Sequence, residues 1–411
     1  MPSKLYPRLT LALLTALNVL NYVDRAVLFG VQPLIQKEFQ VNDFQVGFLN
    51  SAFFISYLCA APFVGLLGDK YARKKIVAIG IIIWSGFTLL SAITHTYNEL
   101  LFRHIMVGVG EASYAVIAPT LIADSFPIQR RGRMLAVFNF AVPFGAALGI
   151  GLGSLMGVRL GWRAPFMVAG IPGFLLAVVL WLLPEPERGK TDSVTATEVR
   201  STLPGLLRNG AFVTATLGLA MYTFALGGLQ QWMPTFLSRV RHIPLGKAGL
   251  IFSAMTCIVA IIATLSGGWL GDMLLKRNHG AYYTLSGVAM LVGVPLMIVA
   301  IYMTGWPMYP AMCAAEFFLL LNTGPLNAAI VNSVSAQIRS TALAINVVVI
   351  HLLGDVPSPS IIGWVSDKAA SLQKGFWVTF LAAALSGIIL VYGSRYAPQL
   401  SDRKTAQRST G

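Results

Sequence analysis

The stretch GLLGDKYARKK, residues 65–75, recurs in altered form as GWLGDMLLKR, residues 268–277. Both copies read Gly-x-x-Gly-Asp and carry a basic residue four positions after the aspartate, Arg73 in the first copy and Lys276 in the second. Each copy follows a long apolar run. A repeat of this kind predicts that the chain is built from two structurally related halves.

The composition places both halves in a membrane. The chain has 411 residues, of which 56% are hydrophobic and only 11% are charged, whereas soluble domains carry about 25% charged residues. Apolar runs near the ~20 residues that cross a bilayer as a helix recur along the whole sequence. We predict an all-α membrane protein with twelve transmembrane helices, centred on residues 9–35, 44–67, 76–94, 100–126, 134–157, 164–183, 211–238, 248–271, 281–303, 307–334, 341–364 and 376–396.

The longest polar segment, residues 184–210, divides these spans six and six. Two pseudo-symmetric six-helix bundles that rock about a site near the midplane are a known plan for secondary transporters. The repeat therefore predicts alternating access. The expected organisation is an N-terminal six-helix bundle over 1–183, a cytoplasmic linker over 184–210, a C-terminal six-helix bundle over 211–396 and a cytoplasmic tail over 397–411.

The net charge of +14 follows from membrane topology rather than from nucleic-acid binding. With the N-terminus placed inside, most of the 30 lysines and arginines fall in inside segments, as the positive-inside rule requires. We predict a multi-pass protein of the inner (plasma) membrane with both termini cytoplasmic and no nucleic-acid partner. No nucleophile–base arrangement, phosphate-binding glycine loop or metal-ligand spacing is found in the sequence, so we expect no enzyme activity, no cofactor and no metal.

Ionisable residues inside the predicted spans mark the expected site. Asp24 and Arg25 lie near the middle of the first span, and Glu111 lies near the middle of the fourth. A charged residue at such depth costs roughly 2.5–3.5 kcal/mol, and it usually faces a cavity or belongs to a proton relay. Adjacent helical residues point about 100° apart, so direct pairing of Asp24 with Arg25 is awkward. The alternative is a purely structural role in holding helices together.

We predict a protonation switch in which Asp24 and Glu111 titrate, because arginine does not usefully deprotonate. Arg25 would bind an anionic headgroup through its planar fork once its carboxylate partner is neutralised. Arg103 lies about 12 Å from Glu111 along the same helix and on roughly the same face, and could assist. The other substrate-binding candidates of the first half are Asn21 and Tyr22.

The second half contains fewer buried charges. His351 and Asp355 are four residues apart, so they can meet on one helix face, either within a proton relay or as a fixed hydrogen bond. Asn322 and Asn327 either line the cavity or satisfy backbone groups near Gly324 and Pro325. The repeated inside loops either latch the cytoplasmic side or are only topology signals. Their candidate gating residues are Gly65, Asp69, Arg73, Lys74 and Asp272.

The first loop resembles the signature of the major facilitator superfamily, Gly65-x-x-x-Asp69-Lys70-x-Ala72-Arg73-Lys74, with Ala72 where glycine is usual. Three further stretches resemble the spinster subfamily: NYVDR at 21–25, VGVGEASYAVIAPTLIADSF at 107–126 and HLLGDVPSPSIIG at 351–363. The resemblance implies a bacterial member of this subfamily. It also implies transport of lysolipids or sphingolipid phosphates, with proton coupling.

We therefore expect a monomeric, proton-coupled secondary transporter. Its expected partners are protons, the lipid bilayer and a small amphipathic or anionic substrate of the lysophospholipid or sphingosine-phosphate type. The NYVDR stretch alone also fits symporters of small organic anions such as sugar acids, and a multidrug-type exporter is a further alternative. The repeated halves and loops disfavour a channel or scramblase.

Overall fold

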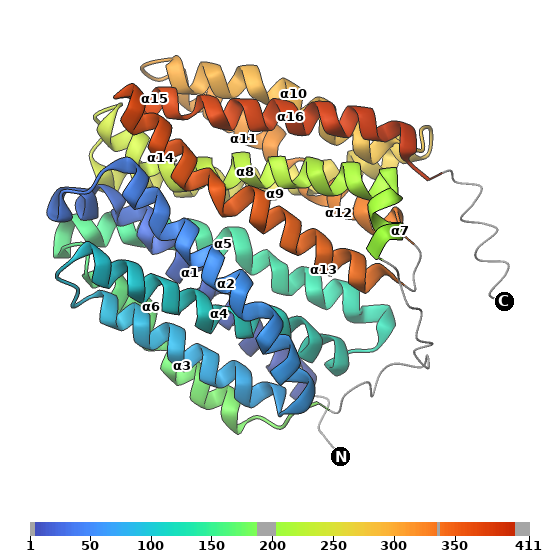
Figure 1. Cartoon of the computed structure of the whole chain (residues 1–411), viewed down its shortest axis with the longest axis horizontal. Coiled ribbons are helices and arrows are strands. Elements are labelled where there is room, and N and C mark those ends of the chain that lie inside the picture. Colours follow the sequence, from blue (N-terminus) through green and yellow to red (C-terminus); the bar gives the residue numbers. More distant parts are fainter. Residues whose placement is uncertain (1–4, 187–202, 335–337, 399–411) are drawn as a thin grey trace. The chain divides into compact units, whose positions relative to one another are not determined.

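The computed structural model describes residues 5–186, 203–334 and 338–398 (Figure 1). Most of the predicted linker and of the C-terminal tail lies outside these ranges. Within them every regular element is a helix, and 12 helical stretches are long and apolar enough to cross a membrane. The predicted fold class is confirmed.

The first half contributes six long helices, and each corresponds to one predicted span. Several extend past the predicted apolar run; the fifth, for example, begins at residue 128 rather than 134. Charged and amphipathic side chains continue a helix beyond the hydrocarbon region, where their polar ends reach water. The six helices are α1 (Leu5–Phe39), α2 (Asp43–Lys70), α3 (Arg73–Ser91), α4 (Tyr97–Ser125), α5 (Ile128–Leu160) and α6 (Ala164–Leu182).

The second half begins with a short helix, α7 (Leu203–Arg208), which falls within the predicted linker. Its last spans consist of several helical pieces, because the backbone is interrupted within them. The remaining elements are α8 (Gly210–Arg239), α9 (Leu245–Leu275), α10 (Ala281–Tyr302), α11 (Met308–Leu320), α12 (Thr323–Asn332), α13 (Arg339–Ile350), η2 (His351–Asp355), α14 (Pro357–Ala369), α15 (Leu372–Gly375), α16 (Trp377–Gly393) and η3 (Ser394–Tyr396).

Two of these interruptions coincide with predicted site residues. The tenth span changes from α11 to α12 at Leu321–Asn322, just ahead of Pro325. The eleventh contains a π-helical turn, His351–Asp355, before α14 begins with a proline at its first residue. A proline inside a helix removes a backbone donor and clashes with the preceding turn, and π turns are frequent at functional sites.

Contacts between residues divide the chain into two compact units. The boundary between these units does not coincide with the division into six spans and six spans. Residues 230–254, which join the end of α8 to the start of α9, pack with the first unit. The described residues 203–229, 255–334 and 338–398 form the second unit. The bundle boundaries given above from the sequence stay a prediction.

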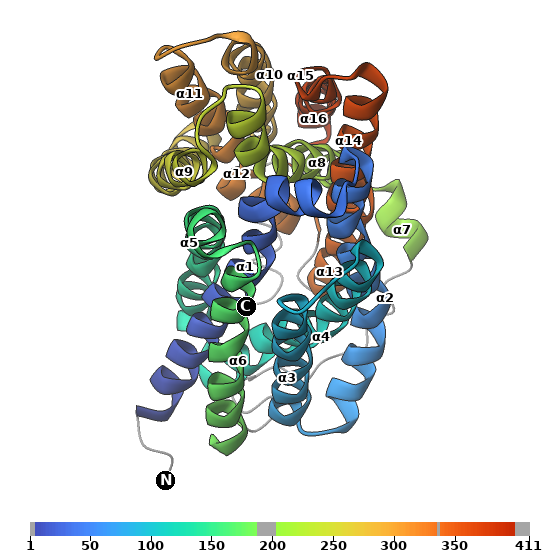
Figure 2. The ribbon, with the colours of Figure 1, turned by 90° about the vertical axis from the view of Figure 1, so that its left-hand side faces the viewer.

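Within the first unit, α1 lies unusually close to α5 (Figure 2). Glycines recur at every fourth position of α5, and β-carbons at three of them would lie within 2.7 Å of α1 carbonyl oxygens. Small residues at such spacing let membrane helices approach closely. This contact fixes the backbone of the α1 segment that carries Asp24 and Arg25. The facing pairs are Gly145 with Val19, Gly149 with Val23 and Gly153 with Val27.

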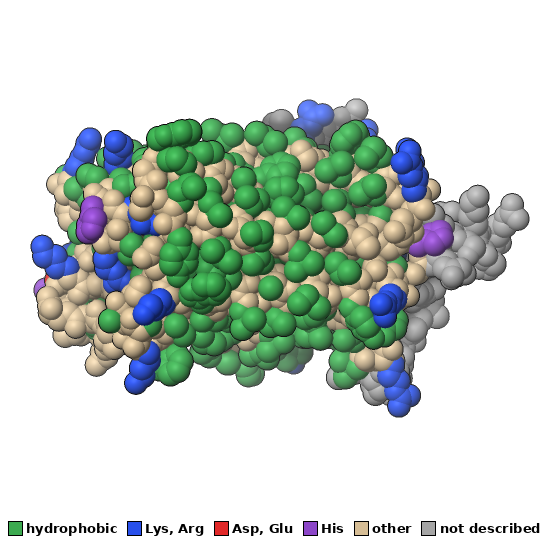
Figure 3. All heavy atoms as spheres, turned by 90° about the horizontal axis from the view of Figure 1, so that it is seen from above, with side chains coloured by type: hydrophobic (Ala, Val, Ile, Leu, Met, Phe, Trp, Pro, Cys, Tyr) green, Lys and Arg blue, Asp and Glu red, His purple; other side chains and the backbone are tan. Residues whose placement is uncertain are grey.

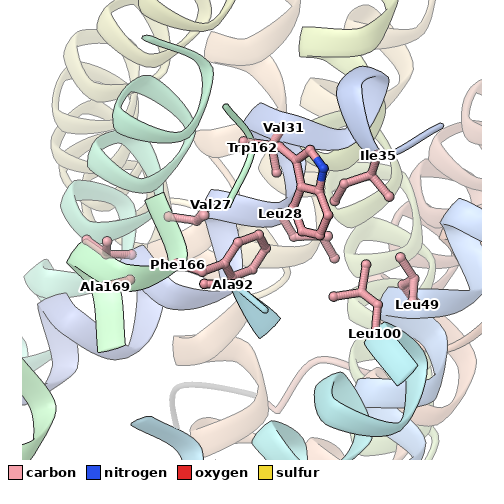
Figure 4. Close-up of a cluster of buried hydrophobic side chains, with 11 residues drawn as sticks. Val27, Leu28, Val31, Ile35, Leu49, Ala92, Leu100, Trp162, Phe166 and Ala169 are labelled. Atoms are coloured by element: carbon pink, nitrogen blue, oxygen red, sulfur yellow. The ribbon is translucent and has the colours of Figure 1, made fainter. Parts of the chain in front are cut away.

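On its other side α1 packs into an apolar cluster of the first unit (Figure 4). Val27, Leu28 and Val31 of α1 meet Trp162 and Phe166 near the start of α6, and all five are buried. Helix α1 is therefore held from two sides. In the face shown in Figure 3, hydrophobic side chains cover the middle, and lysines and arginines gather toward both ends, as expected for a surface that faces lipid.

Candidate functional site

Arg25 and Glu111 form a buried ion pair between α1 and α4. The Nε of Arg25 donates to Oε2 of Glu111 at 2.5 Å, and the Glu111 side chain is 0% exposed. A charge-assisted bond of this kind compensates for much of the cost of removing both groups from water. The structure thus brings together one predicted proton-coupling residue and one predicted substrate-binding residue.

Asp24 points away from this pair toward α3. Its Oδ2 accepts a hydrogen bond from the Thr88 hydroxyl at 2.6 Å, and both residues are buried. The two neighbours Asp24 and Arg25 therefore have different partners on different helices, in agreement with their angular separation on a helix. Thr88 was not predicted as the partner of Asp24, although a polar residue inside the third span is a weak signal.

Four aromatic rings surround the Arg25 guanidinium. Its Cζ lies 4.9 Å from the ring centre of Phe53, 5.1 Å from Tyr22, 5.4 Å from Tyr57 and 5.8 Å from Phe54. Three of the rings come from α2 and one from α1. Cation–π contacts stabilise a guanidinium without neutralising it. Arg25 therefore remains a positive centre within an apolar wall.

Asn21 lies beside the ion pair, one helical turn before Arg25, and its side chain interacts with the Glu111 carboxyl group. Both Oε1 of Glu111 and Nδ2 of Asn21 are buried. A buried donor beside a buried acceptor can satisfy both groups, as buried polar atoms usually require. The position of Asn21 is in keeping with its predicted place in the site.

Two glycines of α4, next to Glu111, allow this arrangement. A β-carbon at Gly108 would lie 2.5 Å from the carbonyl oxygen of Phe53 on α2, and one at Gly110 would lie 2.7 Å from the backbone nitrogen of Trp84 on α3. Any larger residue would push α2 or α3 away from Glu111. Helix α4 is therefore close to both neighbours where the ion pair forms.

Arg103 is placed differently from the other predicted headgroup ligands. Its guanidinium donates to the Leu90 carbonyl and, at 2.8 Å, to the Thr94 hydroxyl, and it lies 3.7 Å from Glu99. These contacts tie it to the C-terminal end of α3. Its role in substrate binding stays a prediction that these contacts do not favour.

In the second unit, His351 and Asp355 meet as their spacing predicts. Nδ1 of His351 lies 2.6 Å from Oδ2 of Asp355 within the π-helical turn. The Asn322 amide donates to the carbonyl oxygen of Leu319 at 3.1 Å and is buried, which satisfies a carbonyl at the end of α11. Asn327 is exposed and donates to the Thr323 carbonyl at 2.8 Å.

The loop motif of the first half is held by partners that the sequence reading missed. Arg73 lies 2.6 Å from Asp124 at the end of α4, and its backbone and guanidinium both donate to Glu185 after α6. Lys74 donates to the carbonyl oxygens of Trp181 and Leu183 at 2.9 and 2.6 Å. Acidic residues at span ends could have indicated Asp124 and Glu185.

A cavity of about 310 Å³ opens beside this motif, with Gly65, Asp69, Arg73 and Asp124 in its lining. In the second half, Asp272 accepts a hydrogen bond from the Tyr282 hydroxyl at 2.6 Å. No group of three or more potential metal ligands occurs among the residues described. These loop residues form local contacts at the ends of their helices.

Comparison with known proteins agrees with this architecture. Residues 14–359 match the family model of the Major Facilitator Superfamily. The frog Xenopus laevis protein named "Protein spinster homolog 1" is 37% identical over 390 residues, covering 89% of this chain and 73% of the relative. The chain belongs to the spinster family of the major facilitator superfamily.

Other spinster proteins extend this result. "Sphingosine-1-phosphate transporter SPNS2" of Xenopus tropicalis is 32% identical over 420 residues, which cover 95% of this chain and 82% of that protein. A crystal structure described as a bacterial homolog to the human lysosomal transporter Spinster, inward-facing and unoccupied, superposes with a TM-score of 0.83 at 22% identity, covering 96% and 97% of the two chains. That likeness shows the fold.

Membership of the spinster family confirms that the chain is a multi-pass membrane transporter and not an enzyme. The chemistry of transport is argued from the site just described, in which an arginine, a carboxylate and four aromatic rings meet.

Proposed function

We propose that this spinster protein is a proton-coupled secondary transporter of amphipathic anions of the lysophospholipid or sphingosine-phosphate type. The observation that carries the proposal is the Arg25–Glu111 ion pair. In this pair a permanent cation is balanced by a fully buried carboxylate. We also propose alternating access, a monomer, a plasma-membrane location and cytoplasmic termini.

Protonation of Glu111 provides the switch. A neutral carboxyl group holds Arg25 by a hydrogen bond but no longer balances its charge, so an anion can take that place. The guanidinium fork can bind two oxygens of one phosphate. Conversely, loss of the proton restores the Arg25–Glu111 pair and expels the anion. One proton and one anionic headgroup are thereby linked at a single arginine.

Asp24 is the second proton-coupling candidate. Its only hydrogen bond given by the structure comes from Thr88, a neutral hydroxyl that can also accept a hydrogen bond from a protonated carboxyl. The contact can therefore persist in either state of charge. Asp24 can store a proton without breaking the attachment of α1 to α3.

The substrate class follows from the surroundings of Arg25. Four aromatic side chains provide apolar surface directly beside the cation, which suits a headgroup attached to a hydrophobic tail better than a fully hydrated sugar acid. The name of the Xenopus tropicalis relative, a sphingosine-1-phosphate transporter, is consistent with this class. Asn21 and Tyr22, next to the arginine on α1, are proposed to contact the same headgroup.

The remaining predicted residues receive supporting roles in this proposal. His351 and Asp355 are proposed as a proton-relay pair of the second unit, where their 2.6 Å contact already links the two groups. The first loop is proposed as a cytoplasmic gate, because Arg73 there binds Asp124 and Glu185 together. A gate of this kind opens when its charge pairs exchange partners.

The test uses purified protein in liposomes that contain a pH-sensitive dye. Addition of lysophosphatidylglycerol or sphingosine phosphate is expected to move protons with the wild type. The variant Glu111→Gln is expected to lose this movement because it cannot titrate, and Asp24→Asn is expected to reduce it. The variant Glu38→Gln is the control, since Glu38 is a half-exposed carboxylate bound to Arg163.

Transport of these lipids without proton movement by the wild type would overturn the coupling. Competition by sugar acids but not by lysolipids would instead favour the small-anion symporter. Retention of full coupling in both carboxylate variants would remove Asp24 and Glu111 from the mechanism.

A further inference from the structure

A second ionisable side chain lies on the same face of α4 as Glu111. His104 precedes Glu111 by seven residues, and seven steps of 100° leave an offset of only about 20°. The residue is 5% exposed. Among the residues that the structure describes, neither nitrogen of its ring has a hydrogen-bond partner.

The surroundings of His104 connect it to Arg25. Its ring lies against Phe53, with 5.4 Å between the ring centres, and the same Phe53 ring lies 4.9 Å from the Arg25 guanidinium. Arg25 and His104 therefore share one aromatic neighbour. The Arg25 charge also acts electrostatically on the His104 ring.

Among the described residues, no acidic group forms an ion pair with His104. Two buried carboxylates of the first unit have other partners, Glu111 in Arg25 and Asp24 in Thr88. The adjacent Arg103 turns to the end of α3. Helix α2 contributes aromatic rings and the Ser56 hydroxyl, which bonds backbone carbonyls. A second positive charge near Arg25 is costly in this buried environment. His104 is therefore expected to be neutral when no anion is bound at Arg25.

An anionic headgroup at Arg25 reverses that balance. The anion would lie near both cations, and a protonated imidazole offers two N–H donors. We propose that His104 is a headgroup-binding residue that takes up a proton from solvent when a phosphate-bearing substrate binds beside Arg25. The inference rests on the proposed function and adds a second ligand to it.

The proposal has a consequence for coupling. The proton on His104 enters with the substrate and leaves with it, whereas the proton on Glu111 only frees the arginine. Histidine is the side chain whose ordinary pKa, near 6.5, allows such a change close to neutral pH. The affinity for substrate should then fall as the pH rises above neutrality.

Calorimetric titration of the purified protein with lysophosphatidylglycerol, below its micelle concentration, tests this. The ligand is a phosphodiester, so it does not itself titrate between about pH 5 and 8. Measurements in buffers of different ionisation enthalpy count the protons bound. The wild type is expected to take up close to one additional proton relative to His104→Gln at pH 7.5.

The variants separate the possible sources of this proton. His104→Gln is expected to bind about tenfold more weakly at pH 6 and to lose the uptake. His104→Arg, with a permanent charge, is expected to bind at least as well as the wild type at pH 8 and also without uptake. The comparison is repeated in the Glu111→Gln background, and His95→Gln, in the loop before α4, is the control.

Two results would overturn the inference. Equal affinity and equal proton uptake in wild type and His104→Gln would overturn it alone, while leaving the proposed transporter in place. Failure of the wild type to bind the lysolipid, or sphingosine phosphate in the same assay, would overturn the proposed substrate class and this inference together.

Discussion

At the scale of single residues, the decisive feature is that the neighbours Asp24 and Arg25 do not pair with each other. Asp24 binds Thr88 on α3, and Arg25 binds Glu111 on α4. Helices α3 and α4 therefore each receive a polar contact from α1. An arginine with a carboxylate partner on another helix can change its partner without disturbing its chain neighbour.

Loss of the Arg25 charge is expected to reduce stability more than the loss of the whole pair. Arg25→Met leaves Glu111 fully buried and unpaired, which costs about 3–5 kcal/mol for a broken buried ion pair. The double variant Arg25→Met with Glu111→Gln removes both charges and is expected to regain most of that stability but no transport. Thermal unfolding in detergent and liposome transport measure the two effects.

The pH dependence of this comparison has a definite sign. An unpaired buried carboxylate becomes less costly when it takes up a proton. The loss of folding stability in Arg25→Met should therefore be smaller at pH 5 than at pH 8. The double variant lacks the carboxyl group and should show no such difference. A loss of stability that does not change with pH would mean that Glu111 has the same protonation state in the wild type and in Arg25→Met.

The residues of the site were partly predictable from sequence. Asp24, Arg25 and Glu111 are rare charges within apolar spans, so their burial and their neighbourhood follow from the cost of placing them in lipid. The rings of Phe53 and Tyr57 were not predictable, because any apolar span contains such residues. His104 could have been predicted from its spacing. It lies seven residues before Glu111 and is therefore closer to the Glu111 face of the helix than Arg103, which lies eight residues before it. The permanent charge of Arg103 made that residue the more visible candidate.

At the scale of helices, the close contact of α1 and α5 positions the site. The glycines of α5 face backbone carbonyls of α1, including that of Val23, next to Asp24. The glycine content of the fifth span is visible in the sequence, but which helix it faces depends on tertiary packing. Likewise, the breaks at Asn322 and at the π turn were indicated only by nearby prolines.

Matched alanine substitutions test this contact. A β-carbon in Gly149→Ala would lie 2.5 Å from the Val23 carbonyl oxygen, so α1 has to shift. Overpacking of this kind costs about 1–3 kcal/mol, and transport should fall with it because Arg25 moves away from Glu111. In Gly86→Ala the nearest atom would be 3.8 Å away, and the stability should be unchanged or higher.

The measurements are the thermal unfolding midpoint and transport rate of both variants. Equal behaviour of Gly149→Ala and Gly86→Ala would show that α1 tolerates a larger separation from α5, and that the ion pair does not depend on this contact.

At the scale of the whole molecule, α8 and α9 are notable because each contributes residues to both compact units. Residues 230–254 pack with the first unit, and Arg239 there binds both oxygens of Asp43 at the start of α2, each at 2.6 Å. Gln36 of α1 donates to the same carboxylate at 2.6 Å. One half-exposed arginine and one buried aspartate therefore contribute to the attachment of this segment.

Asp43→Asn is expected to loosen the attachment of residues 230–254. A partly exposed ion pair contributes about 1 kcal/mol, so its loss should raise the population of a detached state about fivefold. Spin labels at positions 37 and 247, in a background without the three native cysteines, report the separation by pulsed electron resonance; the fraction of longer distances should increase. Because Arg239 is partly exposed, high salt should act on the wild type in the same direction.

The control for this prediction is Glu99→Gln, which weakens an ion pair confined to α4. An unchanged distance distribution in Asp43→Asn would mean that the apolar packing of α8 and α9 holds this segment without the ion pair, and that any movement during transport occurs elsewhere.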